Sequence, residues 1–417
     1  MLLVAASGCA RPATGANAAT PQTENRIEQA LQTGDVVTAL GVAQDYERRV
    51  PGPEAWSYMG RALWRLGELQ RAEGFHRRSA GDAHPEGQLG LARALAARGE
   101  FEAALELADP SLAVGSMSSR AASFVGSISW RLLRPAAAAE QFERGAATAT
   151  AETARRLNRW AHLLREAPAG AWAWRGTAGV VPTALENGST WAEVRIGGHA
   201  ARLRVDPYAW RSSITPTFAD RAGLSTESQI DALHVQLGGI EAMVPMRRSP
   251  EGEGDGVLGF DVLSRVRWMW TPTSGYLLVG VAGDEAEEVL FQRDLERTHW
   301  VHARVIIDGL DAQLVVFPRV GARPVAATLA FVGANTVATH TAVAVTEREA
   351  LALGETVELL TRVGGWSDSV AYRVGPEMMA ARQVPIATPV VFGAEFTSGW
   401  TWRWSPSARQ LAMIRPR

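Results

Sequence analysis

The chain has 417 residues, of which 47% are hydrophobic and 21% charged, so it is long enough for two or three globular domains. Its formal net charge of -2 leaves no basic surplus that would indicate nucleic acid as a partner and no acidic surplus that would indicate a solvated tail. After the first few residues, no apolar run is long enough to span a membrane as a helix. One cysteine, Cys9, cannot support a disulfide framework.

The N-terminal segment places that cysteine at the end of an apolar run. Leu2 to Gly8 are apolar or small, and Cys9 follows them directly. This pattern resembles a bacterial lipoprotein signal, in which the cysteine is lipidated and becomes the first residue after cleavage. The resemblance implies a signal remnant over residues 1–9, lipidation at Cys9, and an exported protein anchored by lipid to the bacterial cell envelope, on its periplasmic or outer surface. The alternative is a disordered N-terminus with a chance cysteine.

Residues 10–23 are rich in Ala, Thr, Gly, Asn and Pro and are predicted to be a flexible tether. Residues 24–166 favour helices throughout, beginning with a pair over Thr23–Leu31 and Asp35–Arg49. A repeated pattern follows, which consists of Trp56, Met59–Gly60, Leu63, Gly67, Ala72 and Pro85, then Leu89–Gly90, Ala94, Gly99 and Ala103–Ala104, then a weaker unit from Ser123 to Phe142.

The repeated pattern resembles tetratricopeptide repeats. The interval from Gly67 to Gly99 is close to the roughly 34 residues of that repeat. Small residues at fixed places let the two helices of a hairpin approach closely, and larger apolar residues are buried between hairpins. The repeats therefore predict either a concave surface that binds peptides or scaffolds partners, or a helical spacer that has no ligand.

The second half of the chain favours β-strands. Residues 167–180 are predicted to be a linker. Strands with alternating polarity are then predicted over Thr190–Ile196, Ala201–Val205, Ala232–Leu237, Arg267–Trp270 and Tyr276–Val281. A helix is predicted from Thr215 to Leu224. The fold class predicted for the whole chain is therefore a helical-hairpin repeat domain followed by a mainly β domain.

The stretch from Gly198 to Ser213 combines a glycine turn, an alternating strand and a carboxylate, Asp206, at the strand end. It resembles the active-site strand of retropepsin-like aspartic proteases, in which Asp-Thr-Gly supplies half of a catalytic dyad. Here Pro207 and Tyr208 stand in place of Thr and Gly. The stretch from Gly256 to Leu263, which leads to Val279, resembles the second block of that family, so residues 181–285 are predicted to form one retropepsin-like lobe.

A second copy follows over residues 286–417. One constant interval separates Gly259 from Gly393, Trp270 from Trp404, and Pro272 from Pro406, so this part of the two copies aligns without a gap. The opening strand recurs at His302–Val316, with Gly309 aligned to Gly198. The interval from Gly198 to Gly309 is shorter than the constant interval of the other matching residues. This difference predicts a stretch of extra residues in the second copy, between Pro324 and Pro385.

Two tandem copies resemble the bilobal, pepsin-like arrangement, in which each lobe gives one aspartate to a shared dyad. In this alignment Phe317 takes the place of the second aspartate, and Pro318 and Arg319 follow it. Phe317, Pro318 and Arg319, together with Pro207 and Tyr208, are thus degenerate catalytic positions.

Asp206 has two interpretations. It is either a surviving catalytic acid, or a carboxylate that caps a turn or pairs with Arg204 or Arg211. The sequence favours the structural interpretation, because Tyr208 replaces the glycine that allows the close approach of a dyad.

Trp268, Trp270, Trp402 and Trp404 also have two interpretations, because residues two apart on a strand share a face. They form either part of the core, which the sequence favours, or a stacking platform for a sugar or peptide.

The function predicted from these residues is an envelope-anchored binding or assembly protein on a catalytically degenerate aspartic-protease-like fold, with an extended peptide or a protein as partner. The alternatives are an active aspartic endopeptidase that uses Asp206, and a purely structural helical-repeat scaffold. No cofactor, metal or nucleic acid is expected, and the membrane is reached through the lipid on Cys9.

Overall fold

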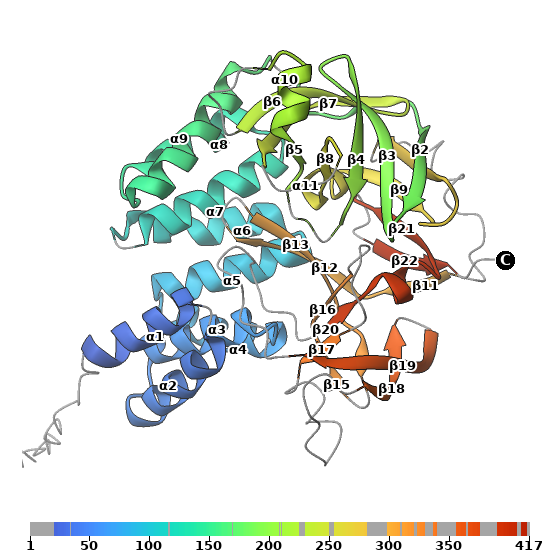
Figure 1. Cartoon of the computed structure of the whole chain (residues 1–417). Coiled ribbons are helices and arrows are strands. Elements are labelled where there is room, and N and C mark those ends of the chain that lie inside the picture. Colours follow the sequence, from blue (N-terminus) through green and yellow to red (C-terminus); the bar gives the residue numbers. More distant parts are fainter. Residues whose placement is uncertain are drawn as a thin grey trace, which may run out of the picture.

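The computed structural model in Figure 1 describes most of the chain from Pro21 onward. The described residues are 21–33, 35–115, 117–168, 170–207, 209, 211–224, 230–249, 254–281, 298–308, 311–320, 323–329, 337–339, 356–363, 366–375, 390–406 and 410–414. In this part of the chain, no helix has the length and apolar character that a membrane crossing requires.

The N-terminal half is a curved stack of helical hairpins (Figure 1). Consecutive helices contact each other along the stack. They are α1 (Pro21–Thr33), α2 (Val36–Arg49), α3 (Pro53–Arg65), α4 (Leu69–Gly81), α5 (Pro85–Arg98), α6 (Phe101–Ala108), the 3-10 turn η1 (Asp109–Ala113), α7 (Ser118–Arg131), α8 (Pro135–Ala146) and α9 (Ala151–Glu166). Proline opens α3, α5 and α8, where a missing backbone N–H breaks no helical hydrogen bond.

The turn inside a hairpin recurs three times with one backbone geometry. Gly67, Gly99 and Leu133 follow α3, α5 and α7, and all three have positive φ angles of 79°, 88° and 56°. The amide of each donates to the carbonyl three residues earlier, at 2.9 to 3.0 Å. This left-handed cap satisfies carbonyls at the helix end and suits glycine. Gly67 and Gly99 thus hold equivalent places in successive hairpins, whereas Leu133 adopts the same conformation with a side chain.

The C-terminal half consists of strands with a few short helices. Lobe 1 and its lead-in contain β1 (Arg175–Gly176), β2 (Gly179–Glu186), β3 (Ser189–Ile196), β4 (His199–Val205), β5 (Ser213–Ile214), α10 (Pro216–Arg221), β6 (Ile230–Leu237), β7 (Ile240–Arg248), β8 (Gly256–Leu258), α11 (Phe260–Leu263), β9 (Val266–Trp270) and β10 (Tyr276–Val281). Lobe 2 contains β11 (Thr298–Val301), β12 (Ala303–Asp308), β13 (Asp311–Val316), β14 (Arg319–Val320), β15 (Arg323–Pro324), β16 (Ala327–Leu329), β17 (Val337–Thr339), β18 (Thr356–Val363), β19 (Trp366–Gly375), β20 (Val390–Phe392), α14 (Ala394–Thr397), β21 (Thr401–Ser405) and β22 (Gln410–Ile414). The predicted fold class, a helical domain followed by a mainly β domain, is confirmed.

The two lobes share one unusual pattern of strand pairing. In lobe 1, β8 is parallel to β4 and antiparallel to β5, β5 is parallel to β7, and β6 is antiparallel to β7. In lobe 2, β20 is parallel to β16 and antiparallel to β17, β17 is parallel to β19, and β18 is antiparallel to β19. The same sequence of parallel and antiparallel contacts is therefore built twice.

One antiparallel sheet joins the lobes, in the order β2, β10, β9, β21, β22 and β11. At its centre, Trp268 of β9 pairs with Trp404 of β21, and Trp270 pairs with Trp402. In the sequence repeat, Trp402 is the counterpart of Trp268 and Trp404 is the counterpart of Trp270, so each strand meets its own repeat at the middle of the sheet. At the centre of this sheet, the sequence repeat is thus an approximate twofold relation in space.

The strand register corrects the alignment of the opening strands. Leu203 pairs with Gly256 in lobe 1, and Ala327 pairs with Val390 in lobe 2. The strand that corresponds to the end of β4 is therefore β16, and not the end of β13 that the alignment selected. Part of the extra length of lobe 2 consequently lies between β13 and β16, where β14 and β15 are inserted, so the predicted insertion began too late in the chain.

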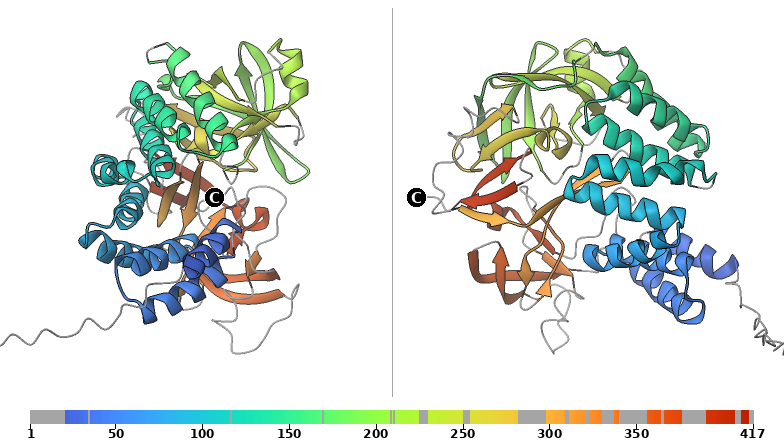
Figure 2. Two further views of the ribbon diagram at one scale, coloured as in Figure 1. Left: turned by 90° about the vertical axis from the view of Figure 1, so that its left-hand side faces the viewer. Right: turned by 180° about the vertical axis from the view of Figure 1, so that it is seen from behind.

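The hairpin of β12 and β13 lies between the helical stack and the lobes (Figures 1 and 2). β12 contacts α5 and α7, and β13 contacts α11 of lobe 1. One hydrophobic cluster accordingly contains buried residues of α5–α7, of lobe 1 and of lobe 2. The helical half is thus packed onto the β half through apolar contacts and is not a separate arm.

Candidate functional site

Asp206 lies directly after β4, in the loop that leads to β5. Its backbone amide donates to the Leu258 carbonyl at 3.1 Å, which extends the parallel pairing of β4 with β8 by one step. Its side chain is buried, with the residue 7% exposed. The carboxylate is 3.4 Å from the Arg204 guanidinium and accepts a hydrogen bond from the Ala209 amide at 3.3 Å. These are an ion pair and a turn cap, the contacts that the structural interpretation of Asp206 predicts.

The loop after Asp206 is braced from lobe 1 itself. Ser212 accepts a hydrogen bond from the Gly259 amide at 2.9 Å and donates to Asp261 Oδ1 at 2.7 Å. The same carboxylate oxygen accepts from the amides of Ser212 and Val262, both at 2.8 Å. Burial raises the pKa of Asp261, while these donors act against the rise. The sequence analysis did not single out Ser212 and Asp261. The one feature of the sequence that could have indicated them is the aspartate at the start of α11.

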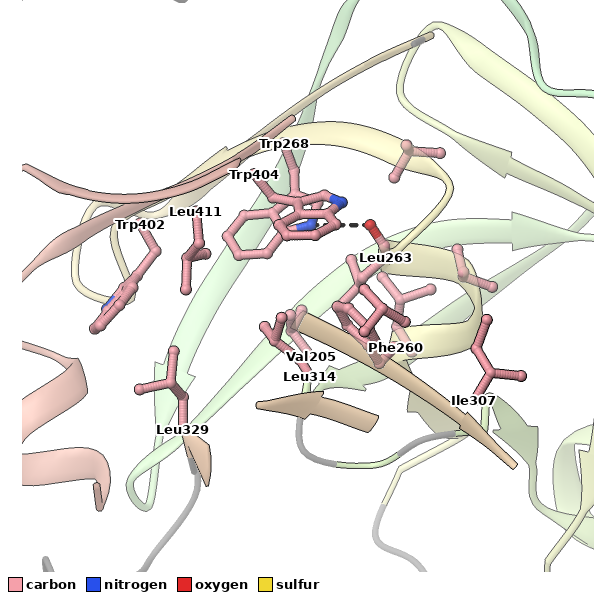
Figure 3. Packing of buried hydrophobic residues seen from close by; sticks show 14 of the residues in the cluster. Val205, Phe260, Leu263, Trp268, Ile307, Leu314, Leu329, Trp402, Trp404 and Leu411 are labelled. Carbon is pink, nitrogen blue, oxygen red and sulfur yellow. Dashed lines mark hydrogen bonds between the residues drawn. The ribbon is translucent and has the colours of Figure 1, made fainter. Parts of the chain in front are cut away.

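Apolar side chains of lobe 2 pack against lobe 1 close to this loop. Figure 3 shows Val205 and Phe260 of lobe 1 in one cluster with Ile307 and Leu314 of the β12–β13 hairpin. All four residues are at most 5% exposed. Next to the loop of Asp206, the contact between the lobes is therefore a dry apolar core.

Lobe 2 offers no aspartate at the corresponding place. Because β16 pairs with β20 as β4 pairs with β8, Leu329 corresponds to Val205, and the next residue in the chain is Ala330, which has no carboxyl group. Phe317, which the alignment placed opposite Asp206, instead packs against the cluster formed by α1–α5, and its ring lies 5.1 Å from that of His302. Pro318 is buried and Arg319 is exposed in β14.

The four tryptophans proposed as a stacking platform are all 2% exposed or less, so that interpretation is wrong. The indole N–H of Trp268 donates to the Leu263 carbonyl at 3.0 Å, and that of Trp402 donates to the Thr397 carbonyl at 2.8 Å. Each acceptor lies five residues before its tryptophan, so the two hydrogen bonds are equivalent in the repeat. The tryptophans therefore form the core of the sheet between the lobes and cannot stack on a ligand.

Two predicted site residues, Cys9 and Tyr208, lie outside the described residues. Among the residues that are described, no three His, Cys, Asp or Glu side chains lie together in a way that could hold a metal ion.

The concave face of the helical stack contains a basic cavity of about 690 Å³. Its walls come from α1, α3, α4, α5 and α7 and from the start of α9. Four arginines line it, namely Arg61, Arg65, Arg93 and Arg120, whereas Glu28 is the one acidic group among its described lining residues. Leu31 and Trp64 supply apolar wall at one side.

A buried ion-pair network holds part of this basic cluster in place. Arg61 is bound to Glu28 and lies 3.5 Å from Glu86, which also pairs with Arg120. Burial alone would raise the pKa of Glu86, but Arg120 and Arg61 lower it to about 2. Burial and the neighbouring Arg61 lower the pKa of Arg120. The cavity therefore carries more positive than negative charge in a weakly solvated place. Its residues come from several helices, and the sequence analysis did not bring them together.

Comparisons with known proteins give a distant likeness. No protein-family model matches the chain, and no curated protein matches it. Conglutin gamma, a basic 7S globulin from lupine seeds, is 12% identical in sequence, with a TM-score of 0.38 over 58% of this chain and 95% of its own. The basic 7S globulin from soybean is 11% identical, with a TM-score of 0.35 over the same shares of the two chains. The description of the β half as two equivalent lobes accordingly rests on its own strand pairing.

Proposed function

We propose that this chain is a non-catalytic binding protein, built from tetratricopeptide-like hairpins and a degenerate, pepsin-like pair of β lobes. The environment of Asp206 carries the proposal. An aspartic protease needs two carboxylates that share a proton, one to activate water and one to protonate the leaving group. Here Asp206 pairs with the Arg204 guanidinium and caps a turn, and the chain has Ala330 directly after the strand that corresponds to β4.

The packing between the lobes supports the same conclusion. Peptide cleavage requires water and an extended substrate beside the catalytic acid. Val205 and Leu258, which flank the loop of Asp206, are fully buried in a cluster with Leu314 and Val316 of lobe 2. Apolar burial of this kind stabilises the contact between the lobes by roughly 1.5–3 kcal/mol for each side chain. We infer that the lobes form a scaffold and that the ligand binds elsewhere.

The concave cavity of the helical stack is the surface that we assign to a polypeptide partner. An extended acidic segment would meet the guanidinium groups of Arg65 and Arg120, and its apolar side chains would meet Trp64. Arginine forks pair with carboxylates through two parallel hydrogen bonds, which are stronger in a poorly solvated cavity than in water. The side chains of Glu28 and Glu86 already hold Arg61, so the partner would bind a preformed surface.

Proteolysis is the first test. The full chain and an Asp206→Asn variant should be incubated with unfolded casein and with a peptide library at acidic and at neutral pH. We expect no cleavage above background from either protein. Cleavage by the wild type that disappears in the variant would show an active aspartic endopeptidase and refute the proposal.

Peptide binding is the second test. A displayed library of random peptides, selected on the wild-type chain, should become enriched in Asp and Glu. Arg65→Glu should weaken the selected peptides at least tenfold, and Arg155→Glu, an exposed change on α9, should leave their affinity unchanged. Selection of peptides without acidic residues, or equal binding by Arg65→Glu, would exclude the cavity as the binding surface and favour the interpretation as a structural scaffold.

We also propose that the protein is attached to the bacterial cell envelope through a lipid on Cys9. The support is the apolar run that ends at Cys9 and the tether that follows it. Fractionation of cells that express the wild type and Cys9→Ser tests this. The wild type should be found with membranes and the variant in the soluble fraction, whereas an unchanged distribution would contradict the anchor.

A further inference from the structure

A second cavity lies where the helical stack, the connector and both lobes meet. Its volume is about 320 Å³, within the range of small-ligand pockets. Its wall is formed by α6 and the end of α7, by Trp172–Trp174 of the connector, by Arg265 after α11, by the end of β10, and by Pro406 after β21. Pockets that bind small molecules are common at such junctions of domains.

Arg265 gives this cavity an unusual cation. Its guanidinium lies over the ring of Trp130, 3.8 Å from the ring centroid. Burial lowers the pKa of Arg265 to about 10, so it stays charged at neutral pH. The negative charge that acts on it belongs to Asp261, but Ser212 and the Val262 amide already hold that carboxylate. Within the described part of the chain, no group accepts a hydrogen bond from this guanidinium.

Trp172 adds a second unused donor. It is 3% exposed, and its buried indole N–H has no acceptor among the described residues. Its ring meets Trp130 edge to face, at 6.2 Å and 88°. A buried donor without an acceptor costs about 1–3 kcal/mol. The cavity therefore combines the guanidinium of the half-buried Arg265 and an indole N–H with the aromatic surfaces of Trp172 and Trp174.

We propose that this cavity binds a small ligand with a flat apolar body and one oxyanion, either a carboxylate or a phosphate. The guanidinium fork of Arg265 would take the oxyanion in paired hydrogen bonds. The body of the ligand would lie against Trp172 and Trp174. Because the helical stack, the connector and both lobes form the wall, occupancy would also stabilise their packing against one another by mass action. This site depends neither on peptide binding in the helical cavity nor on the absence of proteolysis.

Calorimetric titration of the full chain with simple probes tests the site. Benzoate and phenyl phosphate represent the two oxyanions, and benzyl alcohol is the neutral analogue, all at one ionic strength. We expect saturable binding of at least one anion, with benzyl alcohol at least tenfold weaker. The tighter anion identifies carboxylate or phosphate as the natural group. Equal binding of benzyl alcohol, or no saturable binding of either anion, would overturn the proposal.

Matched variants locate the binding. Arg265→Met removes the charge and keeps an apolar stem, and it should weaken the anion at least tenfold. Trp172→Phe removes the N–H donor together with part of the aromatic surface and should weaken it several-fold, and Arg155→Met on α9 should have no effect. Should Arg265→Met fail to fold, Trp174→Ala at the half-buried edge of the cavity replaces it, with the same expected loss. Wild-type affinity in a folded Arg265→Met, or in Trp174→Ala when it replaces that variant, would refute the assignment.

Discussion

Lobe 1 and lobe 2 have the same strand pairing, but they differ in the residue that follows the strand paired in parallel with β8 or β20. In both lobes a glycine, Gly259 or Gly393, follows the strand that pairs in parallel with β4 or β16. In both, a tryptophan of the central sheet donates its indole N–H to the carbonyl of the last residue of the preceding short helix, which is Leu263 of α11 or Thr397 of α14. Only lobe 1 has a carboxylate after its parallel strand, and that carboxylate is neutralised by a cation. The strand pairing is therefore present in both lobes, whereas an aspartate directly after the parallel strand is present in lobe 1 alone.

The difference extends to the helical half. The β12–β13 hairpin of lobe 2 packs against α5 and α7, while the β3–β4 hairpin of lobe 1 lies in a sheet with β2, β6 and β8. In lobe 2, an insertion between β13 and β16 separates the β12–β13 hairpin from β16, which is the counterpart of the end of β4. In lobe 2 this hairpin therefore contacts the helices α5 and α7, whereas in lobe 1 the corresponding residues belong to the continuous strand β4. The two copies share a topology and differ in the surface that each one buries.

The largest expected effect comes from exchanging a backbone residue between the lobes. Gly256 has φ of 147°, and a Cβ there would lie 2.0 Å from the Ser213 carbonyl oxygen, whereas lobe 2 has Val390 at the same place. Gly256→Val should lower the free energy of unfolding by about 4 kcal/mol or more. Gly275→Ala, where φ is positive but a Cβ would make only an ordinary contact of 3.7 Å with the Thr183 carbonyl oxygen, should lower it by about 1 kcal/mol. Denaturant unfolding measures both, and equal losses would contradict the clash.

A smaller effect should be the same in both lobes. Trp268→Phe and Trp402→Phe each remove an indole N–H and leave a carbonyl, of Leu263 or Thr397, without its donor. Each change should lower the free energy of unfolding by about 1–3 kcal/mol. Because the bonds are equivalent, we expect the two losses to agree. A loss for Trp402→Phe close to zero would show that the lobes differ in their cores as well as at the Asp206 position.

The pH dependence of lobe 1 gives a third test, through Asp261. Burial raises the pKa of Asp261 in the folded chain, so the folded state binds this proton more tightly than the unfolded state. The stabilisation is present below the unfolded pKa and is lost as the pH rises through the folded pKa. Asp261→Asn should therefore flatten the fall in stability above about pH 4, measured by denaturant unfolding at several pH values. An unchanged slope would show that Asp261 titrates normally.

The smallest effect is expected at Asp206 itself. Asp206→Asn keeps an acceptor for the Ala209 amide and weakens the pairing with Arg204, so it should lower the free energy of unfolding by about 1 kcal/mol. Asp206→Ala, which removes both interactions, should have the larger effect. Thermal unfolding of the three proteins measures the difference. An increase in stability for Asp206→Asn would indicate a strained carboxylate and reopen the question of a catalytic role.

Local sequence patterns predicted the elements well. The alternation over Thr190–Ile196 is β3 to within one residue, and the helix predicted from Thr215 is α10, with Thr215 as its cap. The constant spacing of matching residues predicted the tandem copies, because the central strands repeat without a gap. The alignment of the opening strands failed after Gly309. The insertion between β13 and β16 leaves the alternation of β13 intact, but it moves the strand that pairs with β20 further along the chain. Only the hydrogen-bond register shows that Leu329, and not Val316 next to Phe317, is the counterpart of Val205.

The sequence by itself determined the class of the fold, the doubling of the lobes and the absence of an intact Asp-Thr-Gly motif. Each of these depends on short-range patterns, in which side-chain period and glycine placement dictate the backbone. The tertiary structure decided what the side chains do. It buried the tryptophans, paired Asp206 with Arg204, and gathered the arginines of separate helices into one cavity and Arg265 with Trp172 into another. Such groups lie far apart in the chain, so their distances and desolvation follow only from the packing of helices against both lobes.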